Sequence, residues 1–117
     1  MTYKLWIDDC RPAPLGYDMW VNSVNQAKAY IVEFENRIEN ALDEWDFPPE
    51  DLWYSTIIID IDHDAGDFAW DGGDYIKLLD WLEETGRNYP IKIHSQNPVG
   101  VQNMRAIIRR NGWKEIF

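Results

Sequence analysis

Cysteine is almost absent from the 117-residue sequence, which contains Cys10 alone. A single cysteine excludes a disulfide within the chain and is typical of proteins from a reducing compartment. No apolar run approaches the roughly 18 residues that a membrane-spanning helix needs. The N-terminal segment MTYKLWIDDC has acids where a signal peptide has an apolar run. We therefore expect a cytoplasmic protein that does not bind membranes.

Positive charge is also scarce. The chain has 11 basic and 21 acidic residues, which gives a formal net charge of −10. Such a surface repels the phosphates of nucleic acids over roughly 8 to 10 Å in cell-like salt. The charge therefore argues against long nucleic acid as a partner. It leaves two interpretations: a surface that keeps the protein soluble, or one that imitates a polyanion.

Hydrophobic residues are plentiful by contrast. They make up 45% of the chain and include seven Trp, six Tyr and four Phe. This composition is sufficient for a packed core and excludes a disordered chain. The length fits one domain of common size, and we find no repeat or linker that would divide it. The sequence thus predicts a single domain over residues 1–117.

Strand and helix patterns alternate along this domain. Strands are expected over residues 3–8, 19–21, 56–61, 91–95 and in the final segment WKEIF. A helix is expected over 24–46, after the N-cap Ser23. Two more are expected, one from the N-cap Asp74 to Gly86 and one from the N-cap Asn97 to Gly112. The alternation predicts an α/β fold with a mainly parallel sheet of four to five strands. The join from Asp8 to Met19 is too short and too rich in proline for a helix, so the first crossover is reduced.

Polar residues follow three of the expected strands. They are Asp8, Asp9 and Arg11 after the first, Asp62, His63 and Asp64 after the third, and His94, Ser95 and Asn97 after the fourth. Both histidines of the chain are among them. In open parallel sheets, ligands bind beyond the carboxyl ends of the strands, near the point where strand order reverses. The pattern therefore predicts a functional site at this edge.

The segments that carry these residues resemble a known family. The stretches LWIDDCRPAP, IDHDAG, GGDYIKLLDWL and IHSQNPVGVQNM are similar, in order, to motifs of the cyclic-phosphate processing receiver-like domains. The resemblance implies a small three-layer, receiver-like (flavodoxin-like) fold and a role in processing cyclic or terminal phosphates. It also implies that the nine polar residues at the strand ends form the site.

The chemistry of the residues agrees with such a role. Histidine titrates near pH 6.5, so one of His63 and His94 is expected to act as base and the other as acid in opening a cyclic phosphate, with Asp62 beside them. Phosphate-binding groups are predicted at the start of the helix after Asn97, where an N-terminus attracts anions. The predicted phosphate-binding residues are Arg11, Ser95, Asn97 and Gly100.

The clustered carboxylates have two interpretations. Asp8, Asp9 and Asp64 are oxygen ligands suited to Mg²⁺ or Mn²⁺, and a cation would relieve their mutual repulsion. Alternatively, the site holds no cofactor and the aspartates orient the histidines or cap helices. Asp60 is a separate case, because strand alternation buries it one step deeper than Asp62. A buried carboxylate needs a partner, and we expect Ser95, Trp6 or a cation to supply it.

Three functions follow, in order of preference. The first is a phosphoesterase-like domain that acts on a small phosphate-containing ligand, such as a nucleotide or an RNA end. The second is an acidic inhibitor that imitates DNA and binds a nucleic-acid enzyme. The third is a phosphoacceptor receiver, although Lys114 lies at the start of the last strand rather than its end. A protein partner is also expected to bind through the acidic helix over residues 24–46.

Overall fold

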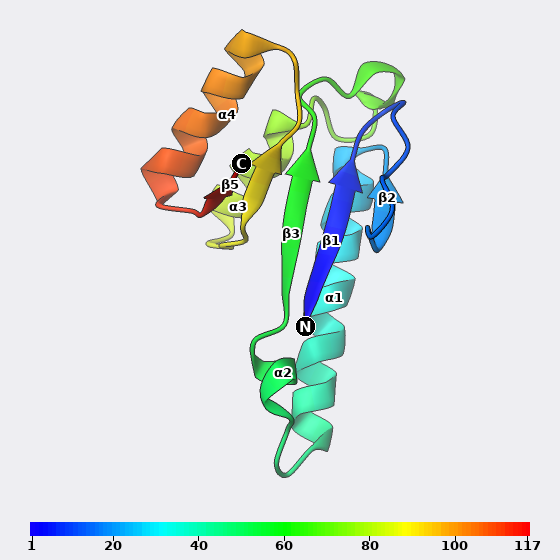
Figure 1. Ribbon diagram of the computed structural model, residues 1–117, viewed down its shortest axis with the longest axis vertical. Helices are drawn as coiled ribbons and strands as arrows, with labels where there is room; N and C mark the ends of the chain where they lie inside the picture. The colour runs from blue at the N-terminus through cyan, green and yellow to red at the C-terminus, as the bar shows by residue number, and fades with distance from the viewer.

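The computed structural model describes residues 1–117, which form one five-stranded sheet with helices packed against it (Figure 1). The strands are β1 (Thr2–Ile7), β2 (Met19–Val21), β3 (Thr56–Ile61), β4 (Ile91–Ile93) and β5 (Glu115–Ile116). They lie in the order β2-β1-β3-β4-β5, and every neighbouring pair is parallel. The predicted α/β class and parallel sheet are confirmed.

The helices are α1 (Val24–Glu44), α2 (Glu50–Trp53), α3 (Ile76–Glu84) and α4 (Pro98–Asn111), with a 3₁₀ turn η1 (Gly66–Phe68). The predicted N-caps of α1 and α4 are confirmed, because Ser23 accepts from the Gln26 amide and Asn97 from the Gly100 amide. The cap predicted for α3 is wrong. The Asp74 carboxylate accepts from the Ala65 amide at 3.3 Å instead, and no side chain caps this helix.

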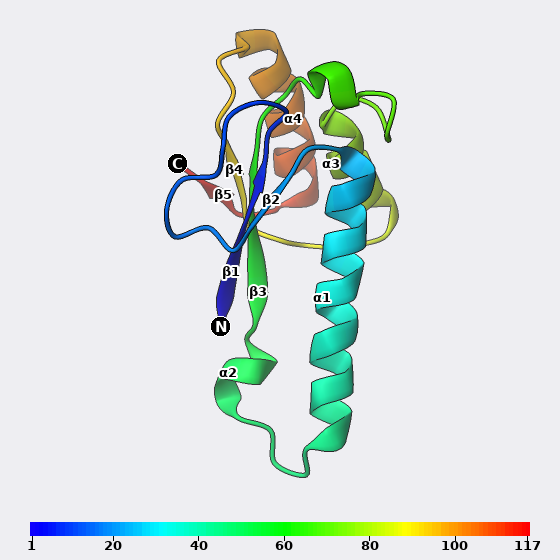
Figure 2. The ribbon, with the colours of Figure 1, turned by 90° about the vertical axis from the view of Figure 1, so that its right-hand side faces the viewer.

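The two faces of the sheet differ in what covers them. One face carries Leu5, Ile7 and Ile59, all fully buried, which pack with α1, α3 and α4 into a single core. Because side chains alternate along a strand, Trp6 and Asp60 point to the other face. Figure 2 shows α1 and α3 on one side of the sheet and the connection between β1 and β2 on the other. This connection takes the place of a helix layer.

The connection over residues 8–18 is the reduced crossover that the sequence predicts. The Trp6 indole donates to the Arg11 carbonyl at 2.7 Å, and the Asp18 amide donates to the Lys4 carbonyl at 2.9 Å. These hydrogen bonds hold an irregular segment against the sheet. The segment then reaches β2 without a crossover helix.

Helix α1 is long for this small sheet. It ends at Glu44, two residues before the predicted end, and extends beyond the strands (Figure 2). Trp45, Phe47 and Trp53 are exposed near that end. No helix of the protein combines the length and the hydropathy that crossing a membrane requires.

Candidate functional site

The polar residues predicted to meet do lie at one edge of the sheet. β1, β3 and β4 are adjacent, and their carboxyl ends lie together at the top of Figure 1. The chain order reverses at β1, which lies between β2 and β3. At this edge, one ligand atom from each of Asp8, Asp62 and His94 lies within 4.8 Å of the others. The edge is therefore the candidate functional site.

Asp8 anchors the turn that follows β1. Its carboxylate is fully buried, and one oxygen accepts from the Cys10 amide at 3.0 Å and from the Arg11 amide at 2.8 Å. The other oxygen lies 2.9 Å from Nε2 of His94. Burial raises the pKa of Asp8, but these backbone and imidazole hydrogen bonds outweigh it and leave the pKa below its ordinary value. Asp8 is therefore ionised at neutral pH.

His94 lies between two buried carboxylates. Its Nδ1 is 2.6 Å from Asp60, its Nε2 is bonded to Asp8, and its ring stacks on Trp6 with centroids 3.8 Å apart. An ionised carboxylate can only accept, so both ring nitrogens donate when both acids are ionised. In this arrangement neither nitrogen of His94 is free to reach a ligand.

Asp60 has partners that the sequence did not predict. Its side chain is only 1% exposed, and its second oxygen accepts from the hydroxyl of Tyr17. The prediction of Ser95 or Trp6 as the partner of Asp60 is wrong, because His94 and Tyr17 bind its two carboxylate oxygens. The Ser95 hydroxyl instead accepts from the Asn97 amide at 3.1 Å.

Tyr17 is the main member of the site that sequence reasoning missed. It lies in the irregular segment after β1, and its ring packs edge-on against Trp6 at 5.3 Å. Burial and the hydrogen bond to Asp60 raise the pKa of Tyr17 to about 12, so the hydroxyl remains a donor at neutral pH. No local pattern marks Tyr17, since its partner Asp60 is 43 residues away.

His63 lies in a different environment from His94. Its Nδ1 is 2.8 Å from an Asp64 carboxylate oxygen and 3.4 Å from Nδ2, the side-chain amide nitrogen of Asn97. Its Nε2 has no hydrogen-bond partner in the protein, although the side chain is only 16% exposed. His63 therefore offers one free ring nitrogen at the edge of the sheet.

Gly100 allows His63 to lie against the first turn of α4. A Cβ atom at residue 100 would lie 2.3 Å from Cδ2 of His63 and 2.4 Å from its Cγ. These distances are far below van der Waals contact, so the imidazole occupies the space that a side chain would need. Glycine at this position sets the orientation of the ring.

The predicted phosphate-binding residues are largely engaged with one another. Asn97 accepts from the Gly100 amide at 3.1 Å, while Ser95 accepts from the Asn97 amide. The amide of Val99 is left without a partner in the first turn of α4. Arg11 is half-exposed, with its Nε 3.6 Å from Asp8. The Val99 amide, the Arg11 guanidinium and the Ser95 hydroxyl, which accepts a hydrogen bond but donates none, are thus the donors that remain open.

Two groups of side chains are close enough to share a cation. One comprises Asp8, Asp9 and Cys10, and the other comprises Asp8, Asp62 and His94. Asp64 belongs to neither group, because it is bonded to His63 and is 64% exposed. The carboxylates fit a hard cation such as Mg²⁺ or Mn²⁺. His94 would have to lose a proton before it could act as a ligand.

Comparison with known proteins identifies the family. A family model described as "Cyclic-phosphate processing Receiver domain" matches residues 3–110. The chain matches no curated protein and no solved structure. The matched range includes strands β1 to β4 except Thr2, all the helices except the last residue of α4, and every residue of the site. The chain therefore belongs to the family of cyclic-phosphate processing receiver domains.

Proposed function

We propose that the protein is a phosphoesterase that hydrolyses a cyclic or terminal phosphate of a nucleotide or an RNA end. The observation that carries this proposal is the free Nε2 of His63 at the carboxyl edge of the strands, where the His63 ring lies against Gly100 in the first turn of α4. The function described for the family supports phosphate processing in general. The remaining steps of the proposal concern the residues of this chain.

His63 is the proposed base. When Nδ1 donates its proton to Asp64, Nε2 carries a lone pair and accepts a proton from water. The resulting hydroxide attacks phosphorus, and the bond from phosphorus to one ribose oxygen breaks. That oxygen leaves as an alkoxide and must receive a proton from an acid.

His94 is the proposed acid, and its surroundings set a condition on this role. Asp60 and Asp8 occupy its two nitrogens, so it donates to substrate only after one carboxylate releases it. Asp62 is the acid at the same edge that lies next to both Asp8 and His94. We therefore propose that Asp62 helps to position Asp8 and His94. His63 is the residue that contacts the reacting phosphate.

The proposed phosphate seat combines a helix end with a side chain. The Val99 amide opens α4, where the helix dipole favours an anion. The half-exposed guanidinium of Arg11 adds a charged donor from the other side of the site. Asn97 and Ser95 hold the first turn of α4 in shape through their own hydrogen bonds.

Gly100→Ala is expected to reduce turnover by about 10²-fold, because it moves the His63 imidazole. Displacement of a reacting group by about 1 Å has an effect of this size. The added methyl group displaces the His63 ring from α4. Alanine is a better helix former than glycine, so α4 is expected to persist. Turnover and melting temperature are measured together, with the exposed neighbour Val99→Ala as the control for the fold. Full activity in Gly100→Ala would contradict the close contact.

A bound divalent cation is the second part of the proposal, with Asp8 as one carboxylate ligand and either Asp9 or Asp62 as the other, since each of these lies in one group with Asp8. Such a cation would neutralise charge on the phosphate when bound. Mg²⁺ or Mn²⁺ is expected to raise the melting temperature as its concentration increases. At a concentration of 100 times the Kd, the free energy of unfolding is expected to rise by about 2.7 kcal/mol. The double variant Asp9→Asn, Asp62→Asn is expected to abolish this gain, whereas the exposed control Asp67→Asn retains it. An unchanged melting temperature at millimolar cation would leave these acids as orienting groups.

The other two candidate functions have less support. A DNA mimic needs carboxylates spread along one surface, but Asp8 and Asp60 are buried within the site. The acidic face of α1 remains a proposed surface for a protein partner. A phosphoacceptor receiver needs a lysine at the end of its last strand, and Lys114 precedes β5. We further propose that the protein acts in the cytoplasm, where the exposed thiol of Cys10 stays reduced.

A screen of phosphate esters by ³¹P NMR tests the proposed function. The panel comprises nucleoside 2′,3′-cyclic phosphates, nucleoside 3′,5′-cyclic phosphates and terminal nucleoside monophosphates, each with and without Mn²⁺. The proposal predicts conversion of at least one ester, with no conversion by His63→Ala. A panel in which nothing is converted, or is converted equally by the variant, would contradict the proposed activity.

A further inference from the structure

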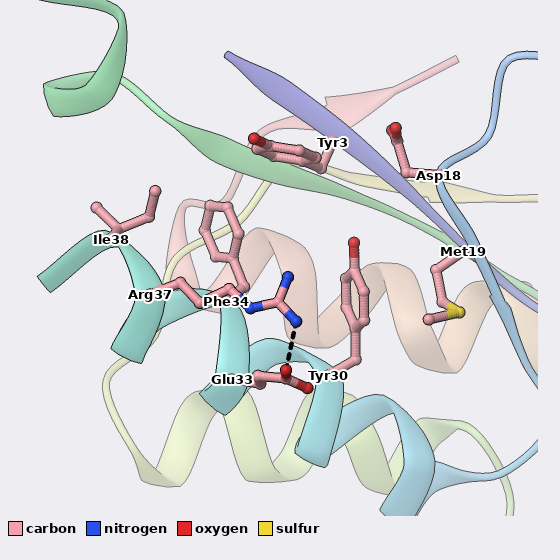
Figure 3. Close-up of a pocket in the computed structure, with 8 residues that line it drawn as sticks. All are labelled: Tyr3, Asp18, Met19, Tyr30, Glu33, Phe34, Arg37 and Ile38. Carbon is pink, nitrogen blue, oxygen red and sulfur yellow. Dashed lines mark hydrogen bonds and ion pairs between the residues drawn. The ribbon is translucent and has the colours of Figure 1, made fainter. Parts of the chain in front are cut away.

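A cavity lies near the N-terminal end of β1, away from the candidate site at the carboxyl end of this strand. It has a volume of about 340 Å³, at the lower end of the range for small-molecule sites. It opens between α1 and the edge of the sheet formed by β1 and the start of β2. Figure 3 shows its lining, in which side chains from α1 face Tyr3 of β1 and Asp18 before β2. None of these residues belongs to the candidate phosphate site.

Three of the eight residues that line the cavity are aromatic. Tyr3 and Phe34 meet edge to face, with ring centroids 5.4 Å apart and planes inclined by 67°. Tyr30 is a third half-buried ring on the same helix as Phe34. An aromatic ring has an electron-rich face, which attracts a positively charged group. Organic cations are attracted to such faces when they come within about 6 Å of a ring centroid.

The charges around the cavity have the sign that suits a cation. Asp18 and Glu33 contribute two carboxylates, and Arg37 contributes the one guanidinium, which pairs with Glu33. The lining is therefore net negative, within a chain of net charge −10. Burial raises the pKa of Tyr30, and the nearby charge of Asp18 raises it further. Asp18 thus adds negative potential at the aromatic walls.

We propose that this cavity binds a small organic cation, an alkylated ammonium group, held by the rings of Tyr3, Tyr30 and Phe34 and by the charge of Asp18. The rings exclude a strongly hydrated metal ion, which needs oxygen ligands on several sides. They accept a methylated ammonium, whose surface is apolar and whose charge is spread over its methyl groups. Arg37 is a competing cation of the protein itself.

This assignment predicts effects of opposite sign at two residues. Asp18→Asn keeps an oxygen that accepts from the Lys4 amide but removes the charge, so affinity for a cation falls. Arg37→Gln removes the competing cation and frees Glu33, so affinity for a cation rises. An anionic ligand would show the reverse at both positions. An exposed i,i+4 ion pair contributes little to stability, so Arg37→Gln is expected to fold normally.

NMR titration with choline tests the proposal, and the neutral isostere 3,3-dimethylbutan-1-ol is the matched control ligand. Choline is expected to shift the ring signals of Tyr3, Tyr30 and Phe34 with a Kd on the order of 1 mM, whereas the isostere binds at least about tenfold more weakly. Asp18→Asn and Phe34→Leu are each expected to raise the Kd for choline by about tenfold. Arg37→Gln is expected to lower this Kd severalfold. The exposed control Phe117→Leu leaves the affinity unchanged.

Equal binding of the isostere, no binding of choline, or weaker binding in Arg37→Gln would overturn the proposal. A short peptide that carries trimethyllysine presents the same head group as choline. Tighter binding of this peptide identifies a modified protein as the source of the cation, and tighter binding of choline identifies a free metabolite. Both results support the site itself.

Discussion

His63→Ala is expected to reduce turnover of a 2′,3′-cyclic phosphate by roughly 10²- to 10⁴-fold, the range typical of a lost general base. The reason is that His63 alone among the two histidines has a free ring nitrogen at the site. Its imidazole lies on the surface of α4 rather than in the core, so stability is expected to fall by less than about 2 kcal/mol. Steady-state turnover and thermal melting of the same sample measure both effects.

The matched control is Asp67→Ala, since Asp67 is exposed in the same loop and makes no hydrogen bond with its side chain. It is expected to retain full turnover and an unchanged melting temperature. A His63→Ala variant as active as the wild type would remove His63 from the mechanism. A variant that is inactive because it is unfolded would be recognised by its melting curve.

Asp60→Ala is expected to cost about 3–5 kcal/mol of stability, as when one partner of a buried ion pair is removed. The substitution leaves Nδ1 of His94 and the hydroxyl of Tyr17 without acceptors in a buried space. For a domain of this size, the melting temperature is expected to fall by roughly 10 °C or more. Chemical denaturation gives the free energy of unfolding directly.

Asp60→Asn provides the graded comparison. The amide keeps the shape and one acceptor oxygen but removes the charge, so the loss of stability is expected to lie between those of the wild type and Asp60→Ala. The pKa of Tyr17, which burial and Asp60 raise to about 12, is expected to fall toward its ordinary value in Asp60→Ala. Unchanged stability in Asp60→Ala, together with lost activity, would show that Asp60 belongs to the chemistry rather than to the support.

Features with local causes were predictable from the sequence. Ser23 and Asn97 cap helices because a side-chain oxygen reaches an amide three residues ahead, which is a contact within one turn. The largely apolar, β-branched run at 56–61 predicted a parallel strand, and parallel strands place their carboxyl ends at one edge. The edge shared by Asp8, Asp62 and His94 follows from this rule alone.

Features with distant causes were not predictable. Tyr17 and Asp60 are separated by 43 residues, and their contact depends on how the irregular segment after β1 folds over the sheet. The cap predicted at Asp74 was wrong because the Ala65 amide, from another turn, binds the same carboxylate. Strand spacing predicted that His63 and His94 are neighbours, but pattern alone does not tell which nitrogens are occupied.

The central claim is that the free Nε2 of His63 faces the phosphate, whereas both ring nitrogens of His94 are bonded to Asp60 and Asp8 before the ligand binds. Long-range ¹H–¹⁵N spectra of the imidazoles test it most directly, because the chain has only two histidines. The ligand is a nucleoside 2′,3′-cyclic phosphorothioate, an analogue that is hydrolysed slowly. We predict a saturable shift of the His63 Nε2 signal when this ligand is added. A shift of His94 with His63 unchanged, or no shift of either ring, would contradict the account.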